Sequence, residues 1–242
     1  MPPPEVEVNT LMPYDAVLFD AAETLFTTRG SIGEIYRSVA LKFGSTASAH
    51  QIQEAFERHF QHSGPLTTDN EKQWWKDIVR RVFSEVGMVD DFDRFFDEIY
   101  ELFRDSRGWI LFPETQGVLE EFRRHGFKLG VISNFDSRLY SVLTDLRILP
   151  LFDSVTICSE TGYAKPQPEI FLAATRALGV DPGRVLFAGD SLLDDYLAGQ
   201  SVGMDAFLLD RSGRYAAMHS VRTIANLSEL LSIAGVDSKQ LT

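Results

Sequence analysis

Five short apolar runs along the chain each end abruptly at polar residues. The first occupies residues 16–19 and ends at Asp20, and similar runs occupy residues 127–132, 155–157, 185–188 and 206–209. Apolar residues without alternation are typical of strands that are covered on both faces, as in a parallel sheet. Helical patterns separate the runs from residue 109 onward, and a last strand and helix follow at 221–224 and after Leu227. This alternation predicts right-handed βαβ crossovers and an α/β fold with a doubly wound parallel sheet.

One segment, residues 29–107, interrupts the alternation. It contains four amphipathic helical patterns and no convincing strand, and Ser31 and Glu34 have the spacing of a capping box at its start. The segment therefore predicts a helical insert with its own small core. The predicted domains are an α/β core, a helical cap and two flexible tails, at residues 14–28 with 108–236, 29–107, and 1–13 with 237–242.

The composition narrows the classes of partner. The chain of 242 residues carries 23 basic and 35 acidic residues, a formal net charge of −12, which disfavours a nucleic-acid partner. Its single cysteine, Cys158, excludes an internal disulfide and suits a reducing compartment. Residues 1–12 lack the pattern of a secretory signal, and no apolar stretch is long enough to span a membrane. We therefore expect a cytoplasmic protein that binds neither nucleic acid nor a membrane.

Polar residues at the ends of the predicted strands are the candidates for chemistry. Asp20, Ser133 and Asp190 each follow a buried run, and Lys165 lies in the loop after the third. Ligands of a parallel sheet bind beyond the carboxyl ends of its strands, so these side chains are expected in one site. Asp20 can attack an electrophile, and Asp190 with Asp195 offers the hard oxygen ligands that Mg²⁺ prefers. The Ser133 hydroxyl and the Lys165 ammonium suit the oxygens of a phosphate.

Four segments in order resemble the motifs of a known family. Residues 17–26, 131–134, 162–171 and 188–204 resemble motifs I to IV of the haloacid dehalogenase (HAD) superfamily. The helical insert between motifs I and II resembles the C1-type cap of that family. The resemblance spans nearly the whole chain and implies a Rossmann-like core, a hydrolase activity and a small, phosphorylated substrate.

The resemblance also implies roles for individual residues. Asp20 is the implied nucleophile, and Lys165 neutralises charge beside it. The implied phosphate- or substrate-binding residues are Thr24, which also helps to hold the turn of the site, Ser133, Asn134 and Lys165. The implied Mg²⁺ ligands are Asp20, the backbone carbonyl of Ala22, Asp190 and Asp195, with Asp194 as the alternative to Asp195.

Ala22 departs from the family pattern. Phosphatases of the family carry an aspartate at this position as general acid and base, a role that contributes about 10²–10⁴-fold and that alanine cannot perform. Glu23 is the nearest carboxylate. Three hypotheses follow: a phosphatase-type hydrolase with reduced activity, a dehalogenase or phosphonatase acting on a C–X or C–P bond, and a degenerate binding protein. The phosphonatase variant needs a cap lysine to form an imine, and the candidates are Lys42, Lys72 and Lys76.

A few further residues have simpler interpretations. His59 and His62 have the spacing of a metal pair, but no third ligand accompanies them. Trp74, Trp75 and the phenylalanines of the fourth helix are expected in the core of the cap, where one ring could line the substrate space. Arg138, just after motif II, is expected on the surface at the start of a helix. Both a monomer and a homodimer are compatible with the sequence.

Overall fold

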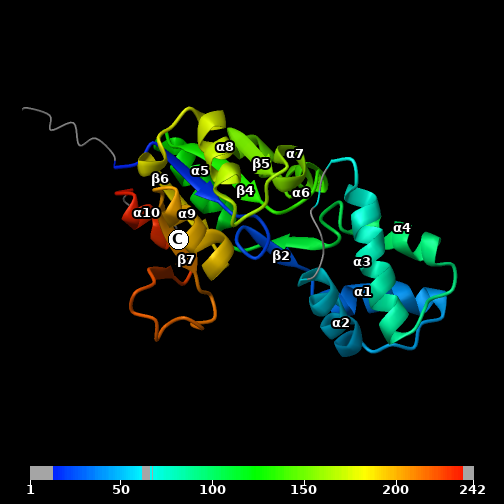
Figure 1. Cartoon of the computed structure of the whole chain (residues 1–242). Coiled ribbons are helices and arrows are strands. Elements are labelled where there is room, and N and C mark those ends of the chain that lie inside the picture. Colours follow the sequence, from blue (N-terminus) through cyan, green and yellow to red (C-terminus); the bar gives the residue numbers. More distant parts are fainter. Residues whose placement is uncertain (1–12, 62–65, 67, 237–242) are drawn as a thin grey trace, which may run out of the picture.

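The computed structural model describes residues 13–61, 66 and 68–236, and its main feature is a six-stranded sheet (Figure 1). The strand order is β5-β4-β1-β6-β7-β8, and every pair of neighbours is parallel. This order confirms the predicted α/β fold with a doubly wound parallel sheet. The strands are β1 (Ala16–Phe19), β4 (Lys128–Ser133), β5 (Ser154–Ile157), β6 (Val185–Gly189), β7 (Asp205–Leu209) and β8 (Thr223–Ile224).

Helices cover both faces of the sheet, which explains the uninterrupted apolar runs. In β1, Val17 and Phe19 pack into one hydrophobic cluster, whereas Ala16 and Leu18 pack into the other. All four side chains are fully buried. The first cluster includes residues of α5 (Thr115–Arg124), α6 (Arg138–Asp145) and α10 (Glu229–Ile233), and the second includes residues of α8 (Pro168–Leu178) and α9 (Ala198–Ser201). A short helix, α7 (Cys158–Thr161), follows β5.

The helical insert forms a separate group of helices to one side of the sheet (Figure 1). It consists of α1 (Ile32–Ala40), α2 (Ala49–Gln61), α3 (Glu71–Val86) and α4 (Phe92–Leu102), and we call residues 32–102 the cap. The capping box predicted at the start of α1 is present, with Ser31 and Glu34 each bonded to the other's backbone N–H. Aromatic rings fill the interior of the cap, as in the edge-to-face pair Phe83–Phe95 with ring centroids 4.7 Å apart. The domain boundaries at 28/29 and 107/108 stay a prediction.

A small antiparallel sheet joins the core to the cap. It pairs β2 (Phe26–Thr28) with β3 (Trp109–Leu111), with Thr27 opposite Ile110. The two chain crossings between core and cap therefore run side by side. This pair is not visible in the sequence, because two three-residue strands are too short to show alternation.

Two predictions concern membranes and the chain ends. No helix within residues 13–61 and 68–236 combines the length and the apolar character needed to cross a membrane. The tails predicted to be flexible, 1–13 and 237–242, lie outside the described residues except for Pro13.

Candidate active site

Three strand ends converge on Asp20. Strand β1 lies between β4 and β6, with Phe19 opposite Val131 on one side and Ala188 on the other. The backbone N–H of Asp20 continues this pairing by donating to the Ala188 carbonyl at 2.9 Å. Ser133, the last residue of β4, and Asp190, directly after β6, therefore flank Asp20. This arrangement is the one that the parallel sheet predicts.

Lys165 reaches into the same site from the loop before α8. Its ammonium Nζ lies 2.5 Å from Oδ1 of Asp20 and 2.6 Å from Oδ1 of Asp195. The Lys165 side chain is only 4% exposed. Asn134 holds the backbone of this lysine, because its side chain accepts from Lys165 N at 2.7 Å and donates to Lys165 O at 3.0 Å. The Asn134 amide is thus committed on both sides to positioning Lys165.

Asp20, Asp190 and Asp195 form an acidic cluster. Each offers one carboxylate oxygen, and the three oxygens lie within 4.8 Å of one another. Asp195 is 1% exposed, and its Oδ2 accepts a 2.9 Å hydrogen bond from Ser191 N. Asp194 lies outside this cluster, half-buried, with its backbone N–H bonded to Ser191 Oγ. The geometry therefore favours Asp195 over Asp194 as the partner of Asp190.

Burial and mutual repulsion perturb the ionisation of this cluster. Burial raises the pKa of Asp20 to about 6 although the Lys165 ammonium acts in the opposite direction. Burial, followed by the charges of Asp20 and Asp195, raises the pKa of Asp190 to about 7. Burial alone would lower the pKa of Lys165, but the two contacting carboxylates raise it well above its ordinary value. Three carboxylates facing one ammonium leave the site short of positive charge, and their hard oxygens fit a cation such as Mg²⁺.

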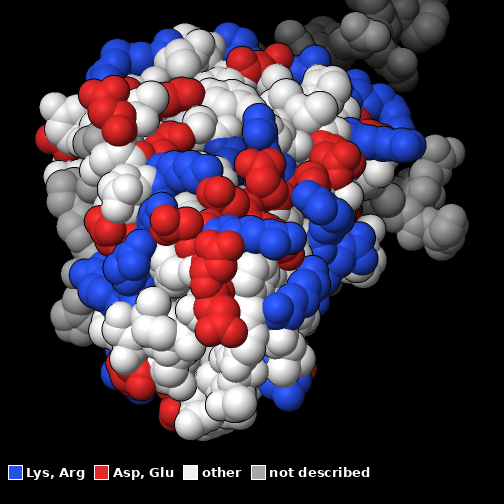
Figure 2. All heavy atoms as spheres, turned by 90° about the vertical axis from the view of Figure 1, so that its right-hand side faces the viewer, with Lys and Arg blue, Asp and Glu red and all other residues white. Residues whose placement is uncertain are grey.

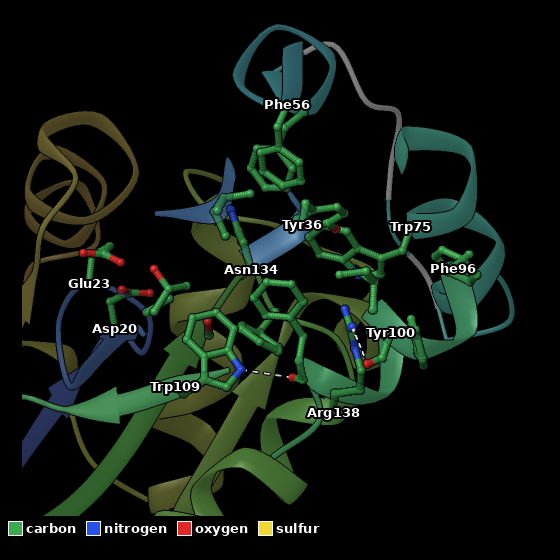
Figure 3. A pocket seen from close by; sticks show the side chains of 18 residues that line it. Asp20, Glu23, Tyr36, Phe56, Trp75, Phe96, Tyr100, Trp109, Asn134 and Arg138 are labelled. Atoms are coloured by element: carbon green, nitrogen blue, oxygen red, sulfur yellow. Dashed lines mark hydrogen bonds between the residues drawn. The ribbon is translucent and has the colours of Figure 1, made fainter. Parts of the chain in front are cut away.

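The turn after Asp20 contains the residues that depart from the family pattern. Ala22 lines the cavity in front of Asp20 and has no group that transfers a proton. Glu23 has a left-handed backbone with φ 62°, and its carboxylate accepts a 2.8 Å hydrogen bond from Thr27 Oγ1. Figure 3 shows the Glu23 and Asp20 carboxylates at the same end of the cavity. Thr24 is fully buried within the turn and does not line the cavity, and its Oγ1 has no hydrogen-bond partner in the described part of the chain.

A cavity of about 300 Å³ extends from Asp20 between the core and the cap (Figure 3). Asp20, Glu23, Ser133 and Asn134 supply its polar end. Aromatic rings form most of the remaining wall, and Trp75 and Phe96 are among them. The sequence indicated that one ring of the cap could line the substrate space, and the structure places rings from all four cap helices there. These rings are Tyr36, Phe56, Phe60, Trp75, Phe96 and Tyr100.

The prediction of a surface position for Arg138 is wrong. Arg138 is 7% exposed and lines the cavity, because the cap covers the start of α6. Its guanidinium donates through Nη2 to Asp136 Oδ2 at 2.6 Å and through Nε to Asp136 Oδ1 at 2.9 Å. It also stacks over Tyr100, 4.1 Å from the ring centroid. An acidic residue two positions before the arginine, directly after motif II, was the available sequence signal.

Hydrogen bonds from the loop after β4 fasten the cap to the core. Trp75 of α3 donates through Nε1 to Asp136 Oδ2 at 2.5 Å. Glu71, at the start of α3, accepts from the Ser137 backbone N–H at 2.9 Å and also from its hydroxyl. Asp136 is fully buried, so this carboxylate joins the Arg138 guanidinium to a cap tryptophan away from solvent.

The three lysines considered as imine formers, and His59 of the possible metal pair, lie away from the cavity. Figure 2 shows basic and acidic side chains interspersed over one face of the molecule. Lys72 pairs with Asp97 at 2.8 Å and Lys76 with Asp93 at 2.9 Å. Lys42 pairs with Glu98 at 3.2 Å, and none of the three lysines lines the cavity. His59 contacts Glu85, whereas His62 lies outside the described residues.

Comparison with known proteins identifies the family of the chain. The family model described as haloacid dehalogenase-like hydrolase matches residues 14–203. The chain belongs to this family of hydrolases. It is 34% identical over 200 residues to haloacid dehalogenase-like hydrolase domain-containing protein 3 of Mus musculus, covering 79% of this chain and 80% of the relative. The Gly189-Asp190 and Asp195-Tyr196 pairs of motif IV predict this same subgroup.

Two further similarities concern proteins named as phosphatases. The chain is 28% identical over 214 residues to the glyceraldehyde 3-phosphate phosphatase of Methanothermobacter thermautotrophicus, covering 81% of this chain and 85% of that protein. It also superposes on the crystal structure of a HAD phosphatase from Thermococcus onnurineus with a TM-score of 0.64 and 25% identity, covering 92% of this chain and 99% of the other.

Proposed function

We propose that the chain is a Mg²⁺-dependent phosphatase-type hydrolase that forms an aspartyl-phosphate on Asp20 with a small phosphorylated substrate. The observation that carries the proposal is the contact of Asp20 with Lys165 inside a cluster of three acids, of which Asp20 and Asp195 are buried and Asp190 is partly buried. A metal-free hydrolase has no need of Asp190 and Asp195 beside its nucleophile. The similarity to two proteins named as phosphatases supports the same choice.

The residues present support a two-step reaction. A carboxylate oxygen of Asp20 attacks phosphorus, the ester P–O bond breaks, and the leaving oxygen takes the electron pair. Lys165 and Ser133 stabilise the phosphoryl oxygens. A water molecule then attacks phosphorus, the bond to Asp20 breaks, and phosphate leaves with the proton of that water.

Mg²⁺ would neutralise the phosphate charge that Asp20 must approach. The residues proposed to hold it are Asp20, the carbonyl of Ala22, Asp190 and Asp195. Asp20 and Asp190 favour such a cation because burial, and then the charges of neighbouring acids, raise the pKa of each carboxyl group.

Ala22 limits the rate of the first step, in which Asp20 attacks phosphorus and the leaving group departs. No side chain at this position protonates the leaving oxygen, so esters of poor leaving groups are expected to react about 10²–10⁴-fold more slowly than with an acid there. Ala22 is also the observation that favours the second candidate, a protein that binds a phosphorylated ligand without turnover. The imine-forming phosphonatase has lost its support, since Lys42, Lys72 and Lys76 lie outside the cavity.

Acetyl phosphate tests the proposal because its leaving group needs no protonation and is too small to depend on the cap. Phosphate release is expected with Mg²⁺ and not with EDTA, and Asp20→Asn should abolish it. Asp97→Asn, at an exposed acid on the cap, is the matched control and should retain the rate. Binding of phosphate without turnover would select the second candidate.

Because Cys158 is a free and buried thiol, we place the enzyme in the reducing cytoplasm.

A further inference from the structure

We infer that the substrate is an aryl phosphate monoester whose aromatic leaving group carries no second anionic group and lies in the cavity between core and cap. This inference rests on the proposed phosphatase function and names the class of its substrate. Three features of the structure support it: the composition of the cavity wall, the pairing of the one cation among its described lining residues, and the missing acid at Ala22.

The aromatic lining and the volume of the cavity suit a flat apolar group. Rings approach from the cap, as Tyr36 and Phe96 do, and from the core, as Trp109 and Phe135 do. Trp109 is fixed in place by a 3.0 Å hydrogen bond from its Nε1 to the Phe103 carbonyl (Figure 3). A volume of about 300 Å³ suits one or two fused rings, since it lies at the lower end of the usual range for small-molecule pockets. Aromatic rings pack on such walls in offset or edge-to-face contact.

The charges of the cavity disfavour a second anionic group on the leaving group. Among the described residues that line the cavity, Arg138 is the only cationic side chain. Asp136 already neutralises it through three hydrogen bonds from Nε and Nη2, and its planar face is occupied by Tyr100. A carboxylate or second phosphate would therefore be buried without a counter-charge, which is strongly unfavourable. Hydroxyacid phosphates do not fit this wall for the same reason, and the hydroxyls of a sugar would lose their hydrogen bonds to water against its apolar rings.

The missing acid at Ala22 points independently to the same class of substrate. When the P–O bond breaks, the leaving oxygen keeps the electron pair as an unprotonated anion. A phenol has a pKa near 10, like tyrosine, and its anion leaves without a donated proton. The anion of an aliphatic alcohol is far more basic and depends on general acid catalysis. The apolar wall and the residue facing the scissile bond thus select one kind of leaving group.

Matched pairs of esters test the inference at constant reactivity. Phenyl and 2-naphthyl phosphate have leaving groups of similar acidity and differ in apolar area, so the larger ester should have a KM about tenfold lower. The 4-carbamoylphenyl and 4-carboxyphenyl phosphates have nearly the same shape and differ in charge. The carboxylate should lower kcat/KM at least tenfold. A phosphotyrosyl peptide should react poorly because the cap covers the cavity.

Two tryptophan substitutions localise the effect. Ile32→Trp fills the cavity from α1 and should bring the phenyl-to-naphthyl ratio of KM values close to one. Leu41→Trp, at a 49% exposed position outside the cavity, should leave that ratio at its wild-type value. If Ile32→Trp does not fold, Ile32→Ala enlarges the same wall and should favour the naphthyl ester further.

Acetyl phosphate distinguishes a failure of the aryl substrate class from a failure of the proposed phosphatase function. If it is hydrolysed while the naphthyl ester shows no advantage, or while the charged ester reacts as well as the neutral one, the aryl class is overturned and the phosphatase function survives. If no phosphate ester or anhydride is hydrolysed, the proposed function fails and this inference fails with it.

Discussion

Asp195 reaches the acidic cluster because Gly189 has no side chain. A Cβ atom at residue 189 would lie 2.3 Å from Cγ of Asp195, a separation that real Cβ atoms do not adopt. Gly189 ends β6, and Asp195 lies in the first turns of the following helix. The close approach of these two residues turns a buried carboxylate toward Lys165 and Asp20.

Gly189→Ala is expected to displace the Asp195 carboxylate and weaken Mg²⁺ binding about 10–100-fold, as changes next to a metal ligand do. Isothermal titration with Mg²⁺ measures the loss. Gly183→Ala, where the new Cβ meets only the Asp181 side chain at 3.1 Å, is the control and should bind as wild type does. Equal affinity in Gly189→Ala and wild type would remove Asp195 from the ligand set.

The perturbed acids predict how stability depends on pH without metal. The pKa values of Asp20 and Asp190, about 6 and about 7, lie above the ordinary 3.8. Since the folded state holds these protons longer than the unfolded state, both acids favour folding at low pH. This advantage is lost as the pH rises from about 4 through about 7.

Urea denaturation in EDTA from pH 4.5 to 8, values spanning roughly that window, should therefore show a falling free energy of unfolding. Asp190→Asn cannot ionise, so its profile should fall less steeply than that of wild type. Mg²⁺ should restore stability at high pH in wild type more than in the variant. Parallel profiles for the two proteins would contradict the shifted pKa of Asp190.

Ala22→Asp places a carboxyl group on the turn beside Asp20. It is expected to speed hydrolysis of alkyl phosphates at least tenfold, within the ~10²–10⁴-fold that general acid catalysis supplies. Aryl phosphates should gain much less, so the dependence of rate on leaving-group acidity should become flatter. Ala22→Asn has the same shape without the acid and should show no gain for either ester.

Glu23 occupies a left-handed conformation that suits glycine. Glu23→Gly removes the steric cost of a side chain there and is expected to raise the free energy of unfolding by about 1 kcal/mol. Glu23→Ala keeps the Cβ and loses the contact with Thr27, so it should be slightly destabilising. If the glycine and alanine variants are equally stable in chemical denaturation, the turn is not strained at this residue.

Among the residues where core and cap meet, Asp136 is expected to be the one whose substitution lowers the free energy of unfolding most. Asp136→Asn leaves the buried Arg138 guanidinium without its counter-charge, which typically costs about 3–5 kcal/mol. Adding Arg138→Met should recover most of the free energy of unfolding, because no unpaired charge remains. Additive effects of the two substitutions in a double-mutant cycle would show that the ion pair is not coupled.

The parts of the fold that the sequence predicted are those with long or repeated patterns. The run at β1 and the capping box at Ser31 have local signals, and both occur where they were predicted. Helix α8 (Pro168–Leu178) has local signals too, since a proline opens it and Gly179 follows its last residue. The β2–β3 pair could not be predicted, since its partners are separated by the whole cap and neither strand is longer than three residues.

Only those residues of the site whose positions follow from the sheet topology could be predicted from the sequence. The positions of Asp20, Ser133 and Asp190 follow from parallel strands that end at one edge. The position of Arg138 depends on how the cap folds over α6, a contact between segments far apart in the chain. A short helix that begins with an arginine looks the same in sequence whether solvent or another domain covers it.

The β2–β3 ribbon has a consequence for Asp20, the proposed nucleophile. Both chain crossings between core and cap pass through it, and their mutual hydrogen bonds make the two crossings move as one strip rather than as two independent linkers. The turn with Asp20, Ala22 and Glu23 runs directly into β2, and the Glu23 backbone N–H donates to the Phe26 carbonyl at 2.7 Å. A tilt of the cap is therefore expected to shift Asp20 and the turn after it, which would link the position of the cap to the geometry of the proposed attack.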